Sequence, residues 1–312
     1  MKPLSFLVVL AATVLPVAAE NVSAALDGDQ VVIVAGDKEI LRYQGEAGEF
    51  PRPDIKEIYR RGGYIQSIHT PSGKLVTDDF PPNHIHHHGV WSPWTHTEFE
   101  GRTPDFWNMG DGKGRVEFVK MDQMWSKDGR AGFKASHRFI DMMAKPEKVA
   151  LLETWEVAVS SADKRYVIDM TITQTCATDS PLKLPEYHYG GLGLRGNRAW
   201  DGAENLKCLT ASGLTDRLKV NTAKEPWCWV GGKVDGETCG VAILCHPSNF
   251  RAPQPIRVHP TEPFFCYAPQ QGGDMAIEPG KPYVARYRLI VADGEPDAEA
   301  LKKAATEYAA VK

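Results

Sequence analysis

Hydrophobic and polar residues alternate with a period of two along much of the chain, a pattern typical of strands with one buried face. The run at 30–44 divides at Gly36 and Asp37, which is a hairpin signal. Similar runs, rich in β-branched and aromatic residues and bounded by Gly, Pro or Asp, occupy 64–70, 115–126, 131–141, 150–160, 166–176, 228–234, 238–246 and 282–292. We predict that each of them is a strand.

Helical spacing occurs in one segment near the C-terminus. Pro296 can open a helix there, and Leu301, Ala305 and Tyr308 then fall on one face. Many strands without interleaved helices favour antiparallel sheets packed face to face over parallel βαβ units. We therefore predict an all-β fold, a large antiparallel β-sandwich with a C-terminal α-helix, as one domain over 20–312.

The first 19 residues have the pattern of a signal peptide. Lys2 precedes an apolar run at 4–14, and small residues at 17–19 suit cleavage near Ala19 and Glu20. No later stretch has the roughly 20 apolar residues of a membrane helix. We expect a secreted or periplasmic protein with no membrane span.

The charge of the chain bears on its possible partners, and its cysteines bear on possible disulfides. The net charge is −4 and Lys and Arg form no cluster, so we expect no nucleic-acid partner. Six cysteines allow 15 pairings. A cross-strand bond between Cys228 and Cys239 and buried free thiols both stay open, and no feature of the sequence fixes an oligomeric state.

Four of the ten histidines lie within five positions, at His84, His86, His87 and His88. If this segment is extended, His84, His86 and His88 face one way and His87 faces the other. Imidazoles so placed can transfer protons near neutral pH, donate to sugar hydroxyls, or bind a metal. Trp91, which follows them, is a candidate platform for a sugar ring.

A second group is Glu186 and His188, which point together if Pro185 begins a strand. This pair can act as acid and base, or complete a metal site begun by the first cluster. We take His84, His86, His87, Glu186 and His188 as the candidate catalytic residues. The sequence identifies no cofactor; the candidate, if there is one, is a divalent metal, Zn²⁺ or Ca²⁺, with His84, His86 and His188 as ligands.

Further side chains are candidates for contact with substrate. Asp105 and Trp107 follow the histidines closely, and an arginine in the proline-bounded loop after His246 can pair with a carboxylate. The full set of predicted substrate-binding residues is Trp91, Trp94, Asp105, Trp107, Arg195, His246 and Arg251.

Several ordered motifs resemble a bacterial family of secreted proteins of unknown function, the so-called methane oxygenase PmoA-like family. They are "TPSGKLVTDDFPPNHIHHHGVW", "DFW", "GLGLR", "GETCGVAILCHPSN" and "ARYRLIVADG". The family's pattern Asp-His-Pro-His-His-Arg-Gly-Leu-Trp matches His84, His86, His87, Gly89 and Trp91. Asn83, Ile85 and His88 depart from it. The resemblance implies a galactose-mutarotase-like supersandwich and a setting among exported sugar-degrading systems.

Three functions stay open. The first is an exported carbohydrate-active enzyme, a lyase or a hydrolase, that uses the histidine-rich site on the sheet face. The second is a non-catalytic glycan-binding protein with the same site. The third is a metal-dependent redox or metal-binding protein. A carbohydrate is the expected partner in the first two.

Overall fold

The computed structural model describes residues 21–162 and 164–311. The predicted signal peptide at 1–19 lies outside these residues. None of the helices in the described part of the chain has the length and hydrophobicity of a membrane span.

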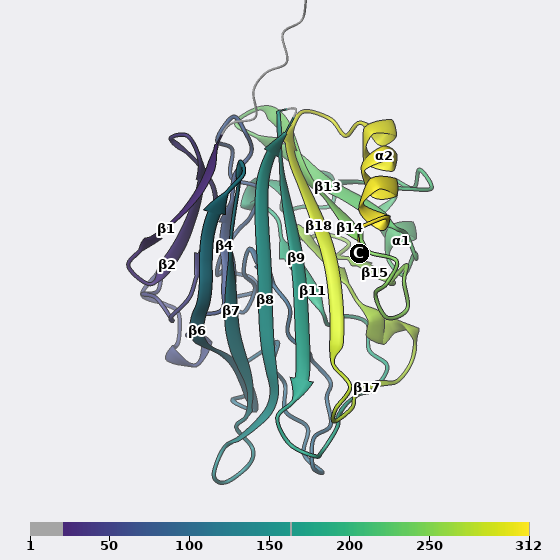
Figure 1. Cartoon of the computed structure of the whole chain (residues 1–312). Helices are drawn as coiled ribbons and strands as arrows, with labels where there is room; N and C mark the ends of the chain where they lie inside the picture. Colours follow the sequence, from purple (N-terminus) through teal and green to yellow (C-terminus); the bar gives the residue numbers. More distant parts are fainter. Residues whose placement is uncertain (1–20, 163, 312) are drawn as a thin grey trace, which may run out of the picture.

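Two eight-stranded antiparallel sheets form the body of the protein (Figure 1). The first has the order β1-β2-β3-β4-β5-β11-β16-β15. Its strands are β1 (Val22–Asp27), β2 (Gln30–Ala35), β3 (Lys38–Gln44), β4 (Tyr64–Ile68), β5 (Val90–Trp91), β11 (Leu192–Arg195), β15 (Ile256–Val258) and β16 (Phe264–Tyr267).

The second sheet has the order β12-β13-β14-β18-β9-β8-β7-β6 and contains the longest strands. Its members are β6 (Gly114–Lys127), β7 (Arg130–Asp141), β8 (Lys148–Ala162), β9 (Arg165–Cys176), β12 (Lys207–Thr210), β13 (Trp227–Val234), β14 (Glu237–Cys245) and β18 (Tyr283–Asp293). The long strands run side by side down the front of the molecule (Figure 1).

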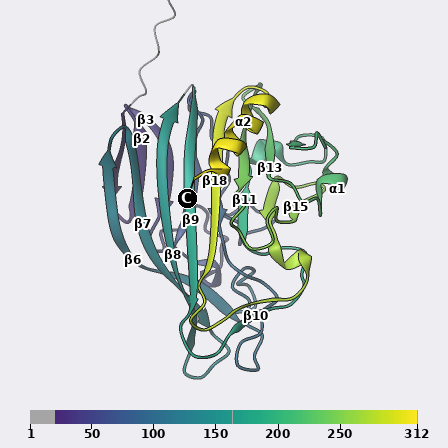
Figure 2. The same ribbon diagram turned by 45° about the vertical axis from the view of Figure 1, so that its right-hand side comes forward.

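The remaining elements are short, apart from the C-terminal helix. β10 (Leu182–Leu184) pairs with β17 (Met275–Ile277) as a separate ribbon. The helices are α1 (Arg217–Val220), α2 (Ala298–Ala309) and the 3-10 turns η1 (Glu57–Tyr59), η2 (Arg198–Trp200) and η3 (Pro269–Gly272). Helix α2 lies against the outer side of the second sheet, beside β13 and β18 (Figure 2).

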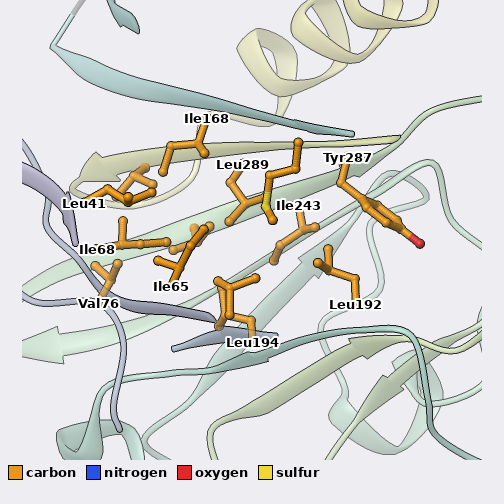
Figure 3. Packing of buried hydrophobic residues seen from close by; sticks show 14 of the residues in the cluster. Leu41, Ile65, Ile68, Val76, Ile168, Leu192, Leu194, Ile243, Tyr287 and Leu289 are labelled. Carbon is orange, nitrogen blue, oxygen red and sulfur yellow. The ribbon is translucent and has the colours of Figure 1, made fainter. Parts of the chain in front are cut away.

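The main core fills the space between the two sheets, because the alternating apolar residues of each sheet point toward the other. Ile65 and Leu194 of the first sheet belong to the same buried cluster as Ile168, Ile243 and Leu289 of the second (Figure 3). The alternation in the sequence thus marks the residues that form this interior.

The predicted fold class is confirmed. All strand pairs are antiparallel, and each of the predicted runs contains a strand. Helix α2 begins just after Pro296, with the Asp297 side chain accepting from the backbone N–H of Ala300, and it buries Leu301 and Tyr308 as predicted.

The six cysteines are all free, and five of them are buried. Cys228 lies opposite Ile243 and Cys239 opposite Gly232, so the two residues do not face each other across the β13–β14 ladder. Of the two alternatives left open by the sequence, the structure has the free thiols.

Strand β6 forms one edge of the second sheet. Its register against β7 shifts twice, between Phe118 and Lys120 and again between Met121 and Gln123. The middle of the strand exposes Lys120 to solvent. This edge is therefore irregular and partly charged.

Candidate functional site

The histidine segment folds as two consecutive turns. The backbone N–H of His84 donates to the Pro81 carbonyl at 3.1 Å, and that of His87 donates to the His84 carbonyl at 2.8 Å. Because the segment is not extended, its side chains do not alternate. The predicted alternation is wrong: His84, His86 and His87 gather together, and His88 turns away from them.

The three gathered imidazoles are in mutual contact. The ring centroids of His84 and His87 lie 4.7 Å apart and stacked, and His86 meets His87 edge-on at 4.7 Å. His259, which follows β15, brings a further ring to 6.2 Å from His84. His88 is instead enclosed, with its ring stacked on Tyr64 at 4.1 Å.

These rings border a cavity of about 180 Å³. Half of the chain's ten histidines line it, together with aromatic and amide side chains and one arginine. The lining residues are His84, His86, His87, Trp107, Asn108, His188, Tyr189, Arg257, His259 and Phe264. We call this space the histidine cavity.

Behind His84 lies the carboxylate of Glu262. Its Oε2 is 2.7 Å from Nδ1 of His84 and accepts a hydrogen bond of 2.7 Å from Nη1 of Arg195. The ring N–H of His84 is not aligned well enough for a hydrogen bond. Two lone pairs at 2.7 Å would repel, however, so we place the imidazole proton on Nδ1, which leaves the lone pair on Nε2.

Arg195 is completely buried and cannot contact a substrate directly. Besides Glu262 it donates from Nη2 to Oδ1 of Asn83 at 3.1 Å. The prediction that Arg195 binds substrate is therefore wrong for this structure. Its guanidinium holds the Glu262 carboxylate in place beside His84.

Burial keeps the imidazoles of the cavity neutral. It lowers the pKa of His86 to about 3, helped by the nearby His84 and His88, and it lowers the pKa of His87 well below the usual range. The pKa of His84 is also lowered by burial, although Glu262 opposes the shift. Near neutral pH the rings are therefore uncharged, and His86 and His87 are weak bases, whereas Glu262 favours protonation of His84.

Tyr189 and Asn108 form another part of the cavity wall. The Tyr189 hydroxyl donates to Oδ1 of Asn108 at 3.1 Å, and burial raises the pKa of Tyr189 to about 12. Asp105 accepts hydrogen bonds from the backbone N–H groups of Trp107 and Asn108 at 2.9 and 3.0 Å. Asp105 therefore shapes this wall and does not line it, contrary to the predicted contact with substrate.

The second predicted group separates in the structure. β10 ends at Leu184, so Pro185 follows a strand and does not begin one. His188 lines the histidine cavity, as predicted, but Glu186 is exposed, lies outside the cavity lining, and donates its backbone N–H to Oδ1 of Asp274. Glu262 occupies the place beside an imidazole that was predicted for Glu186.

Trp91 and Trp94 are core residues. Both are completely buried, and Nε1 of Trp94 donates to Oε1 of Gln174 at 2.7 Å. The prediction that they bind sugar rings is wrong for this structure. Of the three predicted tryptophans, only Trp107 borders the cavity, and it too is completely buried.

His246 and Arg251 lie away from the histidine cavity. The His246 ring packs against Tyr308 of α2, and its Nε2 lies 3.0 Å from the carbonyl oxygen of Val311. Arg251 donates to the carbonyl oxygens of Pro269 and Asp274, each at 2.8 Å, and so anchors the segment around η3. Neither is available for the predicted substrate contacts.

The predicted metal ligands do not form a site. In residues 21–162 and 164–311, no group of three or more His, Cys, Asp or Glu side chains is arranged to hold a metal ion. His84 and His188 share the cavity, but Nδ1 of His84 faces Glu262 and the ring of His188 contacts Tyr187 and Tyr189. The set His84, His86 and His188 therefore does not fit a metal in this arrangement.

A family model described as "Family of unknown function (DUF6807)" matches residues 30–306. The chain belongs to the DUF6807 family. This match overturns the resemblance drawn from the motifs, since nothing indicates membership of the PmoA-like family. No curated protein matches the sequence.

Solved structures similar to this DUF6807 member include two α-galactosidases from Geobacillus stearothermophilus and a galactose mutarotase-like protein from Clostridium acetobutylicum. AgaA, as a variant bound to 1-deoxygalactonojirimycin, is 9% identical over 86% of this chain and 40% of its own, with a TM-score of 0.35. AgaB is 8% identical over 87% and 39%, with a TM-score of 0.32. The mutarotase-like protein is 10% identical over 87% and 98%, with a TM-score of 0.38.

The chain spans about two fifths of the length of these α-galactosidases. With TM-scores below 0.5, the likenesses carry no argument about the function of this DUF6807 member. The chemistry of the site must therefore be read from its own residues.

Sequence reasoning missed a second segment that forms the site. The stretch "RVHPTEPF" supplies Arg257, His259, Glu262 and Phe264. Nδ1 of His259 accepts from the backbone N–H of Glu262 at 3.1 Å, so this loop turns tightly between β15 and β16. Two prolines, one directly after His259 and one directly after Glu262, were the available signal, because they indicate a rigid loop that carries polar side chains.

Proposed function

We propose that this protein is an exported carbohydrate-active enzyme that removes a proton from a sugar unit held in the histidine cavity, with His84 as the general base. The observation that carries the proposal is the Glu262 carboxylate 2.7 Å behind Nδ1 of a half-buried, neutral imidazole. A carboxylate in this position fixes the tautomer with a basic Nε2 and stabilises the imidazolium that forms. Export is proposed from the segment at 1–19.

A carbohydrate suits the lining of the cavity. Asn108 and the neutral imidazoles offer donors and acceptors for hydroxyl groups, while Tyr189 and Phe264 offer apolar ring surface. The volume of about 180 Å³ limits the occupant to one small unit, such as a single sugar residue at a chain end.

Elimination fits the cavity better than hydrolysis does. Hydrolysis normally uses two carboxylates that flank the bond, and no Asp or Glu lines the cavity among the described residues. In elimination, His84 takes the proton next to the sugar's carboxylate, the electron pair forms a C=C bond, and the neighbouring C–O bond breaks. Arg257 can hold that carboxylate, and the Tyr189 hydroxyl can protonate the leaving oxygen.

A glycan-binding protein without catalysis is the second candidate. It is favoured by the aromatic content of the cavity wall, since stacked rings and hydroxyl donors suffice to hold a sugar without any bond being broken.

The test incubates the purified protein with acidic and neutral glycans and measures new reducing ends and unsaturated products. His84→Asn should lower turnover about 10²- to 10⁴-fold, the usual contribution of a general base. His96→Asn is the matched control, because His96 is exposed and lies outside the cavity lining. Glycan binding without product would support the binding protein. Neither binding nor product across the panel would overturn both candidates.

A further inference from the structure

A second cavity, of about 720 Å³, lies next to strand β6 and the turn η1. Neighbouring residues line the two cavities: Met109 lines this one and Asn108 lines the histidine cavity. Its wall combines apolar side chains, such as Ile58 and Phe118, with several charged ones. A volume of this size is typical of sites for small molecules.

The charged wall contains one arginine that forms no ion pair with a carboxylate. Four arginines (Arg60, Arg61, Arg115 and Arg138) face three glutamates (Glu46, Glu57 and Glu117). Three of the arginines pair with carboxylates at the rim: Arg60 with Glu57, and both Arg115 and Arg138 with Glu117. Among the described residues, no carboxylate lies within ion-pair distance of Arg61.

Arg61 is also deeply buried, with only 4% of its surface exposed. Its Nε donates over a long 3.4 Å to the carbonyl oxygen of Gly62, and Nη1 is buried without a hydrogen-bond partner. Burial lowers the pKa of Arg61 to about 10, so the side chain is still a cation at neutral pH. Its guanidinium carbon lies 5.9 Å from the centre of the Tyr64 ring, and the Glu153 and Asp79 carboxylates raise its pKa without forming an ion pair. A buried cation without a paired anion costs several kcal/mol.

The backbone holds Arg61 in this position. Gly63 has a φ of +73° and donates its N–H to the Gln44 carbonyl at 2.8 Å. A Cβ atom at Gly62 would lie 1.8 Å from the carbonyl oxygen of Gly45, so only glycine allows the segment to approach β3 this closely. The segment after Arg61 is thus fixed against the sheet, and the unpaired guanidinium stays beside the cavity.

We propose that this cavity binds a small molecule that carries an oxyanion group, a carboxylate or a sulfate ester, and that Arg61 pairs with that group. A guanidinium can donate two parallel hydrogen bonds to either anion, which gives both charge balance and orientation. The apolar wall beside Arg61 can cover the rest of the ligand. The proposal is independent of catalysis by His84.

The test measures binding of glucuronate, glucose 6-sulfate and glucose by isothermal titration calorimetry at constant ionic strength. Glucuronate or glucose 6-sulfate should bind, and the stronger of the two identifies the anion; glucose should bind at least tenfold more weakly. Arg61→Gln should weaken the anion about 10- to 100-fold, because it removes charge-assisted hydrogen bonds. Ile58→Trp, which fills the cavity without touching the charge, should weaken it as well.

Arg130→Gln is the matched control, because Arg130 is exposed and lies outside the cavity lining. It should leave binding of the anion unchanged. Without ligand, Arg61→Met should raise the melting temperature, since it removes an unpaired buried charge. The proposal is overturned if neither anion binds, if Arg61→Gln binds the anion as well as wild type does, or if Arg61→Met lowers the melting temperature.

Discussion

The buried pair of Arg195 and Glu262 gives the sharpest test of the candidate site. Glu262→Ala leaves a fully buried guanidinium without its carboxylate, 2.7 Å away in the structure. Removing one partner of a buried pair typically costs about 3–5 kcal/mol. Arg195 keeps a bond to Asn83 at 3.1 Å and has Asp201 at 3.9 Å, so we expect the lower end, about 3 kcal/mol.

The assay is urea unfolding followed by circular dichroism. At an m-value of about 3 kcal/mol/M, the expected loss moves the midpoint by about 1 M. Glu262→Gln keeps an acceptor oxygen but loses the charge, so it should cost about half as much. Glu147→Ala is the matched control: Glu147 pairs with Arg115 at the surface, where such a pair contributes at most about 1 kcal/mol.

A double-mutant cycle with Arg195→Met isolates the interaction from the effects of each change alone. Residues in direct contact typically couple by about 0.5–3 kcal/mol, and we expect a value near the top of that range because Arg195 is fully buried. If Glu262→Ala costs no more than Glu147→Ala, or if the coupling is absent, then Arg195 does not hold Glu262 in place. The proposed orientation of His84 would lose its basis.

Two further predictions concern acid sensitivity and the core. His86 gains a proton below about pH 6.5 in the unfolded chain but only below about 3 in the folded protein. Between these values the unfolded state binds more protons, so stability falls as the pH falls, and His86→Asn should flatten this slope in unfolding measured from pH 7 to pH 4. Trp94→Phe leaves the buried side-chain oxygen of Gln174 without its donor and should cost about 1–3 kcal/mol in the same urea assay; an unchanged midpoint would contradict the bond.

The strands could be predicted from the sequence because each one has its own alternation of hydrophobic and polar residues. The runs at 131–141 and 166–176 alternate regularly, and the structure pairs them with their neighbours in the expected antiparallel manner. The C-terminal helix likewise has its own period and its own N-terminal signals at Pro296 and Asp297. In the second sheet, the neighbours β6 to β9 and the pair β13–β14 follow from these local patterns and short turns, whereas the place of β18 between β9 and β14 does not.

The histidines of the candidate site could be predicted from the sequence, but its carboxylate could not, because the site is formed by loops from distant parts of the chain. The histidine cluster was visible as a sequence motif, and four of the five predicted catalytic residues line the cavity. The carboxylate was misplaced because Pro185 follows a strand, which puts Glu186 in solvent. Glu262 lies 178 positions after His84 in the chain, and only the pairing of β11 with both β5 and β16 brings the two loops together. No local sequence pattern predicts that the loops carrying His84 and Glu262 lie side by side.

The irregular edge formed by β6 has a consequence for how the protein behaves at high concentration. A long strand with unpaired backbone groups is a template onto which a second molecule can add its own strand, the first step toward fibrils. The two register shifts in its pairing with β7 make β6 irregular along its length. Lys120 adds a charge that an incoming strand would have to desolvate. The sheet with the longest strands thus ends in an edge that discourages self-association.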